Sequence, residues 1–227
     1  MINNEYSNII GKYVNEMKSN FKQELKMILI IGSSCSEKVI KNWSDIDVIL
    51  VFDEIDIDTM EKVREIASSY KIKIGITVYN KVEFLSKKID SKTFYHLYLA
   101  QLNEISIHYK EDSFVIPKVS FEEVKFVYNI YLNQVMHVYK RYFLYNDLTK
   151  QQVRDFYKSL YILMKTMLII NGYLPKNYEE VFNIYSKEYN VELFDYQKFI
   201  SAYLDNNDES KEQLLSYSKK IFSKIYK

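Results

Sequence analysis

Two short apolar runs near the start of the chain constrain the fold most. Residues 26–31 have the sequence Lys-Met-Ile-Leu-Ile-Ile, and residues 48–52 have the sequence Val-Ile-Leu-Val-Phe. Neither run shows the alternation of apolar and polar residues that is typical of a strand with one face in water. Continuous apolar runs of this length indicate strands that are buried on both faces. We therefore expect a sheet that other elements cover on both sides.

The periodicity around these two runs predicts further helices and strands. Apolar residues recur at spacings of three and four over residues 5–22 and 57–69, which is the pattern of amphipathic helices. Residues 72–79 alternate as a half-buried strand does, and residues 105–109 are a further candidate strand. The sequence thus predicts an α+β domain over residues 1–116, with helices packed on a mixed sheet.

The second half of the chain carries helical patterns only. We expect helices at 121–145, 149–170, 177–188, 194–204 and 209–226. Ser120 is the candidate N-cap of the first of these helices, and Gly172 supplies the left-handed residue that ends the second. These patterns predict an all-α helical bundle domain over residues 117–227.

The charge balance limits the partners that the chain can attract. Thirty-one Lys and Arg residues offset thirty Asp and Glu residues, which leaves a net charge of +1. A charge this small gives no general attraction for nucleic acid or for an anionic membrane, so an anionic ligand needs a local site. The single cysteine, Cys35, excludes an internal disulfide, and no apolar stretch reaches the ~20 residues of a membrane span. We expect a cytoplasmic protein with no membrane contact and no nucleic-acid template.

A glycine turn and two aspartates provide the candidate site. The first apolar run ends at Gly32 and Ser33, where the missing Cβ lets the backbone approach a ligand and the serine adds a hydroxyl donor. Asp45 and Asp47 are separated by one residue on a strand, so both carboxylates point to the same face. Two adjacent carboxylates need a cation, and they suit Mg²⁺, which proteins usually hold with one or two carboxylates and the phosphates of a substrate. Ser44 precedes them and is placed to bond a further phosphate oxygen.

These residues resemble the signature of a known superfamily. Gly32-Ser33 followed by Ser44-Asp45-Ile46-Asp47-Val48 is similar to the motif of nucleotidyltransferases, which include DNA polymerase beta, minimal nucleotidyltransferases and aminoglycoside adenylyltransferases. The expected helical bundle is similar to kanamycin nucleotidyltransferase C-terminal and HEPN-like domains.

The resemblance implies a division of roles among the site residues. Gly32 and Ser33 would hold the triphosphate, and Asp45 and Asp47 would be the catalytic residues that bind Mg²⁺. The implied reaction is attack of an acceptor hydroxyl on the α-phosphate of a nucleoside triphosphate, with pyrophosphate as the leaving group.

The chain departs from the superfamily pattern at one position. The resemblance implies a third carboxylate on the strand at residues 72–79. The side chains expected on the non-core face of that strand are Lys73, Gly75, Thr77 and Tyr79. None is acidic, and Gly75 stands at the missing position. Carboxylates of the helical half remain open as replacements: Glu122, Glu123 and Asp155.

Two further groups of charged residues have alternative interpretations. Lys158 and Lys165 are seven residues apart on one expected helix and lie on nearly the same face. In the resembling enzymes a basic residue on such a helix reaches the triphosphate, and a solvated flank is the alternative. The acidic residues from Asp53 to Asp58 indicate a solvated loop, with Asp58 as a candidate helix N-cap, rather than a second metal site.

The leading hypothesis is a Mg²⁺-dependent nucleotidyltransferase that uses ATP or another nucleoside triphosphate. It would transfer a nucleotidyl group, with adenylyl as the commonest case in the resembling families, to a hydroxyl of a small molecule or protein. The alternative is a catalytically degenerate member of the fold that binds a nucleotide or a partner, and Gly75 favours it. A homodimer is also left open.

Overall fold

The computed structural model describes residues 4–35, 39, 44–102, 107–144, 149–192, 216, 219–221 and 223–224. The chain packs as two compact units, Met1–Val124 and Lys125–Lys227. The expectation of two domains, 1–116 and 117–227, stays a prediction, because compactness alone does not establish independent folding. None of the described helices has the length and hydropathy of a membrane-spanning segment.

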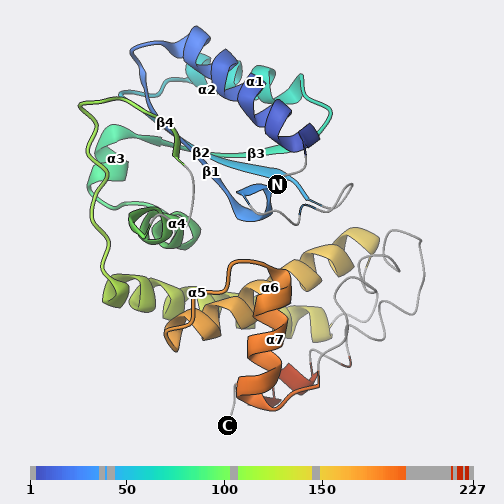
Figure 1. Ribbon diagram of the computed structural model, residues 1–227. Coiled ribbons are helices and arrows are strands. Elements are labelled where there is room, and N and C mark those ends of the chain that lie inside the picture. The colour runs from blue at the N-terminus through green and yellow to red at the C-terminus, as the bar shows by residue number, and fades with distance from the viewer. Residues whose placement is uncertain are drawn as a thin grey trace. The chain divides into compact units, whose positions relative to one another are not determined.

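The first unit is built on a mixed four-stranded sheet, which confirms the predicted fold class (Figure 1). Its elements are α1 (Asn4–Phe21), β1 (Leu25–Ile31), the 3₁₀ helix η1 (Gly32–Cys35), β2 (Ile46–Phe52), α2 (Ile57–Ser68), β3 (Ile74–Asn80), α3 (Lys81–Leu85), α4 (Ser91–Gln101) and β4 (Ile107–Lys110). The strand order is β3-β2-β1-β4. β1 runs antiparallel to both β2 and β4, whereas β2 and β3 are parallel.

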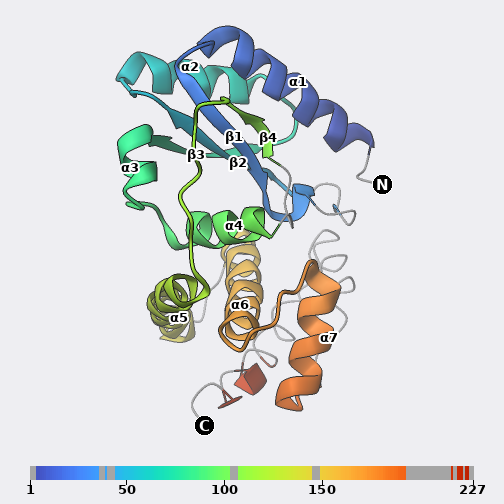
Figure 2. The same ribbon diagram turned by 60° about the vertical axis from the view of Figure 1, so that its left-hand side comes forward.

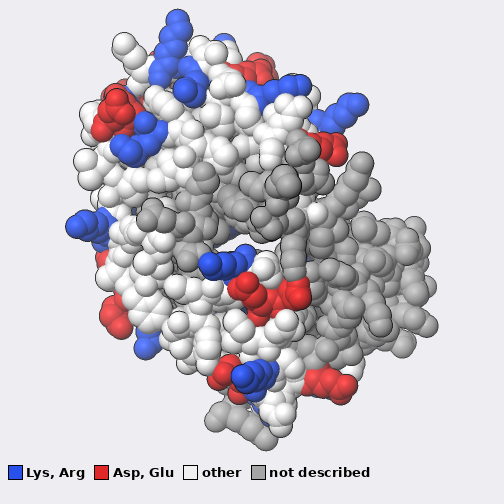
Figure 3. Space-filling view, in the orientation of Figure 1, with Lys and Arg blue, Asp and Glu red and all other residues white. Residues whose placement is uncertain are grey.

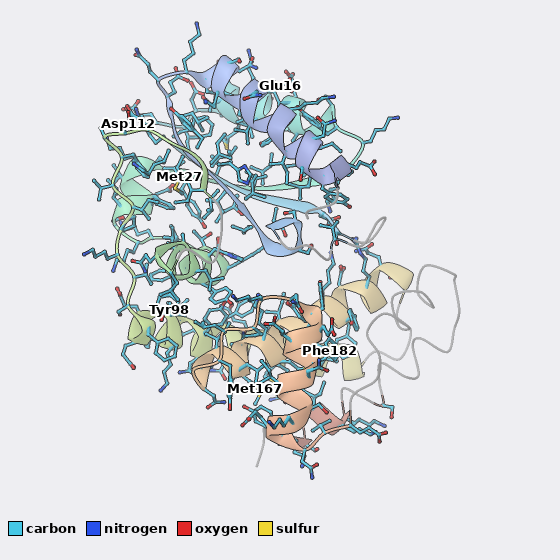
Figure 4. The ribbon with its side chains drawn as sticks, in the orientation of Figure 1. Glu16, Met27, Tyr98, Asp112, Met167 and Phe182 are labelled. Carbon is cyan, nitrogen blue, oxygen red and sulfur yellow. The ribbon has the colours of Figure 1, made fainter. Side chains whose placement is uncertain are left out.

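Helices cover both faces of this sheet, as the two apolar runs predict. α1 and α2 lie on one side, and α3 and α4 lie on the other (Figures 1 and 2). Tyr13 and Met17 of α1 pack in one core with Ile28 and Leu50 of the two central strands. On the opposite face, the ring of Phe84 packs against Phe114 at a centroid distance of 5.8 Å. Every residue of β1 is buried, and Figure 4 shows Met27 inside the first unit.

The sequence analysis did not predict α3 and α4, and the structure gives the reasons. α3 has five residues and is defined by its capping box, in which Asn80 and Glu83 bond each other's backbone N–H. α4 buries residues on most of its circumference, from Thr93 to Leu99, so its sequence lacks a polar face. These helices also correct the prediction for Tyr79, which was expected on the non-core face of the strand but is 8% exposed beneath them.

The acidic segment after β2 caps a helix, although with a different residue from the one expected. Asp56, not Asp58, is the N-cap of α2 and accepts a 2.7 Å hydrogen bond from the backbone N–H of Thr59. The prediction was wrong because the helix begins at Ile57, within the acidic segment. Asp53 forms an ion pair of 3.5 Å with Lys26, so it acts as a structural charge of the sheet.

The C-terminal part is helical, as predicted. It contains α5 (Phe121–Leu144), α6 (Lys150–Ile170) and α7 (Tyr178–Tyr189). Ser120 and Glu123 form the expected cap at the start of α5. The predicted helix 194–204 lies outside the described residues, as does most of 209–226.

The end of α6 and its packing against α7 follow from local sequence. Gly172 has a φ of +88° and its N–H bonds the carbonyl of Ile169, while the N–H of Tyr173 bonds that of Leu168. These two bonds form a Schellman motif, which confirms the predicted stop. Aromatic rings join the two helices, and Met167 and Phe182 mark this region in Figure 4.

Candidate active site

The candidate site lies at one end of the sheet, where three strands meet in register. Because β1 and β2 are antiparallel, Ile31 at the end of β1 pairs with Asp47 near the start of β2. Because β2 and β3 are parallel, Asp47 also pairs with Gly75. Gly32 follows Ile31 directly. We call Gly32, Asp47 and Gly75 the site row.

The turn at Gly32 packs directly on the Asp47 carboxylate. Gly32 has a φ of +75°, in the left-handed region that favours glycine. A Cβ at this position would lie 2.9 Å from Asp47 Oδ2, so the close approach also requires glycine. Ser34 fixes the turn by donating a 2.9 Å hydrogen bond to the Ile31 carbonyl. The predicted tight turn is confirmed, while the role of Gly32 and Ser33 in phosphate binding stays a prediction.

Burial alternates over residues 45–48, as the spacing of the two aspartates predicts. Asp45 and Asp47 are half-buried, whereas Ile46 and Val48 are each 1% exposed. Asp47 shares the face of Ile49 and Val51, because side chains of a strand alternate. That face is the one that α3 and α4 cover (Figure 2).

The chain just before β2 is anchored to α1. The Tyr6 hydroxyl donates a 2.9 Å hydrogen bond to the Ser44 carbonyl, and both residues are buried. Burial and then the negative charge of Asp45 raise the pKa of Tyr6. Asp45 therefore lies within electrostatic reach of the Tyr6 hydroxyl. A contact of Ser44 with a phosphate stays a prediction.

Gly75 stands beside the Asp47 carboxylate, at the position that the sequence analysis assigned to the missing third acid. A Cβ on Gly75 would lie 3.1 Å from Asp47 Oδ1. Any side chain here would begin in close contact with that oxygen. Among the described residues, no group of three or more His, Cys, Asp or Glu side chains is placed to hold a metal ion.

A lysine that the sequence analysis missed occupies this side of Asp47. Lys92 is the second residue of α4, and its Nζ lies 3.2 Å from Asp47 Oδ1. Their side chains are 50% and 35% exposed. A sequence signal did exist, because Asp90 precedes the run of α4 as an N-cap residue and accepts from the N–H of Thr93.

A hydrogen-bond network between Tyr79 of β3 and the first residues of α4 fixes the start of that helix and hence the backbone of Lys92. The Tyr79 hydroxyl donates a short hydrogen bond to Asp90 Oδ2, and the Thr93 hydroxyl donates a 3.0 Å bond to the same oxygen. Burial and the bond to Asp90 raise the pKa of Tyr79 to about 12. Desolvation alone would raise the pKa of Asp90, but the bonds from Tyr79 and Thr93 hold it below its ordinary value.

Two of the three open replacements for the third acid, Glu123 and Asp155, have other partners, and a metal role of Glu122 stays a prediction. Glu123 caps α5 and accepts a 2.6 Å hydrogen bond from Lys87 Nζ. The Lys87 bond lowers the pKa of Glu123 to about 2. Asp155 accepts a 2.8 Å bond from Gln151 within α6. Neither carboxylate belongs to a metal-binding group of described residues.

Lys158 and Lys165 lie on α6 of the second unit, and both are half-buried. Their contact with a triphosphate stays a prediction. Figure 3 shows Lys and Arg side chains interspersed with Asp and Glu over the described part of the face in view. The mixture agrees with the net charge of +1.

Comparison with known proteins assigns the fold. No family model matches the chain, and no curated protein sequence matches it. Among solved structures, however, the chain has the fold of a nucleotidyltransferase. One similar structure is that of spectinomycin adenyltransferase AAD(9) from Enterococcus faecialis with ATP and spectinomycin. The match has a TM-score of 0.52 and 14% sequence identity, and it covers 95% of this chain and 98% of that chain.

Proposed function

We propose that this protein is a Mg²⁺-dependent nucleotidyltransferase. It transfers a nucleotidyl group, with adenylyl as the first candidate, from a nucleoside triphosphate to a hydroxyl of a small molecule or protein. The observation that carries the proposal is the glycine turn packed on Asp47, within a fold similar to that of an adenyltransferase. A Cβ at Gly32 would lie only 2.9 Å from Asp47 Oδ2. The matched structure was determined with ATP and spectinomycin, which supports a triphosphate and a small-molecule partner.

The two aspartates fit one magnesium ion that arrives with its nucleotide. Mg²⁺ prefers oxygen ligands and is usually held by one or two carboxylates together with substrate phosphates. Asp45 and Asp47 would supply the carboxylates, and the bound ion would stabilise charge on the reacting phosphate. Gly32 lets the backbone approach the phosphates, and Ser33 offers a hydroxyl donor beside them. The protein's part is then mainly to position the triphosphate against the acceptor.

The test is binding first and turnover second. Calorimetry with ATP, GTP, CTP and UTP should detect binding that depends on Mg²⁺. Pyrophosphate release should then appear when hydroxyl-bearing acceptors, aminoglycosides and spectinomycin among them, are screened. Asp47→Asn should lower the release rate at least about 100-fold, because even residues behind metal ligands contribute about 10- to 100-fold.

A matched control separates the site from general effects of charge. Asp112 is an exposed aspartate in the loop after β4, labelled in Figure 4, and it lies near the other end of β1. Asp112→Asn should release pyrophosphate at the parent rate. Failure of all four triphosphates to bind, with or without Mg²⁺, would refute the proposed function.

A second candidate is a nucleotide-binding or partner-binding module that has lost catalysis. The specific observation that favours it is Gly75 beside Asp47, with Lys92 Nζ 3.2 Å from the oxygen that faces it. This candidate predicts Mg²⁺-dependent binding of a triphosphate, no pyrophosphate release with any acceptor, and weaker binding in Asp47→Asn.

A further inference from the structure

We propose that the Lys92 ammonium takes the place of a second metal ion at Asp47, so that the site binds one divalent cation for each nucleotide. This inference rests on the proposed function, because it concerns the metal that accompanies the nucleotide. It assigns Lys92 as a positioning residue of the site, a role that the sequence analysis did not foresee.

The two oxygens of Asp47 have different neighbours. Oδ2 faces the Gly32 turn, where a Cβ would lie 2.9 Å away. Oδ1 faces β3, where a Cβ on Gly75 would lie 3.1 Å away, and it also receives the Lys92 Nζ at 3.2 Å. The ammonium therefore contacts the same Asp47 oxygen that a side chain at position 75 would approach. Gly75 and Lys92 are thus neighbours of the same Asp47 oxygen.

The charges of the site agree with one metal ion. A third carboxylate would add a negative charge beside Asp47, whereas Gly75 adds none. Lys92 instead places a positive charge 3.2 Å from Asp47 Oδ1. A site with less negative charge at Asp47 suits a single Mg²⁺ that shares the triphosphate oxygens.

The position of Lys92 does not depend on its ion pair alone. A half-exposed ion pair contributes little free energy by itself and would not fix a lysine. The backbone of Lys92, however, follows the N-cap Asp90, which Tyr79 and Thr93 hold. Tyr79 and Thr93 are 8% and 1% exposed, so the helix start is embedded in the unit. The fold thus holds the backbone of Lys92 beside the site, and the half-exposed side chain can reach both Asp47 and a phosphate.

The experiment counts metal ions by a method that does not need turnover. Mn²⁺ serves as a paramagnetic substitute for Mg²⁺, and bound Mn²⁺ is measured by electron paramagnetic resonance beside bound α,β-methylene ATP, which does not transfer its nucleotidyl group. The parent protein should bind one Mn²⁺ per nucleotide. The double variant Gly75→Glu with Lys92→Met should bind two, whereas Gly75→Glu alone should bind one, because Lys92 then neutralises the added carboxylate.

A second measurement uses Mn²⁺ without nucleotide. Lys92→Met removes a tethered competitor for Asp47, so its Mn²⁺ affinity should rise about two- to fivefold, the weight of a half-exposed ion pair. Lys88→Met is the matched control, since Lys88 is an exposed lysine just before α4, and its affinity should equal that of the parent.

The outcomes separate the two proposals. Two Mn²⁺ ions per nucleotide in the parent would overturn the role of Lys92 and leave the proposed function intact. Equal Mn²⁺ affinity in Lys92→Met and the parent would also overturn it. A parent that binds Mn²⁺ but no nucleotide would refute the proposed function, and the Lys92→Met comparison would still decide whether the lysine competes at Asp47.

Discussion

Removal of the Tyr79 hydroxyl tests whether its hydrogen bonds hold the start of α4 beside the site. The hydroxyl donates to Asp90 Oδ2, lies 3.2 Å from the Thr93 hydroxyl and accepts a 3.1 Å bond from the Asp90 N–H. Tyr79→Phe removes these contacts and leaves the ring, which packs 6.2 Å from Phe84 between centroids. The variant therefore isolates the hydrogen bonds from the packing of β3 and α3.

The expected cost follows from the charge of the acceptor. A hydrogen bond to a charged group contributes about 1.5–3 kcal/mol to stability. The Thr93 bonds still cap α4, so we expect the free energy of unfolding to fall by about 2 kcal/mol. With a urea dependence of about 2 kcal/mol per molar, the midpoint should fall by about 1 M.

The assay is urea unfolding followed by the fluorescence of Trp43, which is the only tryptophan and precedes Ser44. Tyr109→Phe is the matched control, because its ring keeps the contact with the Lys18 ammonium, 5.1 Å from the centroid. That variant should change stability by less than about 0.5 kcal/mol. A Tyr79→Phe midpoint equal to that of Tyr109→Phe would refute the anchoring of α4 by this hydroxyl.

The same variant predicts a dependence on pH. The pKa of Asp90 is lowered in the folded protein, so its stabilising contribution is complete above the unfolded value and is lost as pH falls through the folded one. Removing the Tyr79 hydroxyl raises that folded pKa. The stability difference between Tyr79→Phe and the parent should therefore be larger at pH 5 than at pH 3.

Three further outcomes are expected. Gly11→Ala should raise the unfolding free energy by about 0.5–1 kcal/mol, because Gly11 is exposed within α1 and an added Cβ meets no atom within 4 Å; urea titration measures it. Gly32→Ala should cost at least about 1–2 kcal/mol in the same titration, since its φ is +75° and its Cβ would lie 2.9 Å from Asp47 Oδ2, and parent-like stability would contradict the described turn. The contribution of Glu123 should be lost as pH falls from its ordinary pKa of 4.5 toward about 2, and Lys87→Met should raise that pKa in a carboxyl NMR titration.

The sheet and its glycine turn could be predicted because their signals are local. The run 26–31 is apolar throughout, and every residue of β1 is buried, so covering on both faces follows directly from composition. The spacing of Asp45 and Asp47 predicts a common face because a strand has a period of two. Since β2 begins at Ile46, after Asp45, that common face stays a prediction. The parallel register of β2 and β3 places Gly75 beside Asp47, and only the superfamily resemblance pointed to that position from the sequence.

The other half of the site could not be predicted because its signals are not periodic. α4 buries Phe94, Tyr95 and Leu97 in one turn, and a helix surrounded by protein shows no polar stripe. Without α4, the sequence pattern does not indicate that Tyr79 is buried or that Lys92 lies beside Asp47. Only the short N-cap signal at Asp90 marked the helix, and such a signal needs a periodic run beside it to be convincing.

Gly75 has a consequence for the history of the site. Its φ is not among the positive values of the chain, so the backbone there does not require glycine. A Cβ at position 75 would lie 3.1 Å from Asp47 Oδ1, so that carboxylate would have to move by a few tenths of an ångström. Glycine codons differ from those of aspartate and glutamate at the second base, so a single mutation can add or remove an acid in the site row. One base change therefore separates this site from a site with a third carboxylate, and the same sheet would support both.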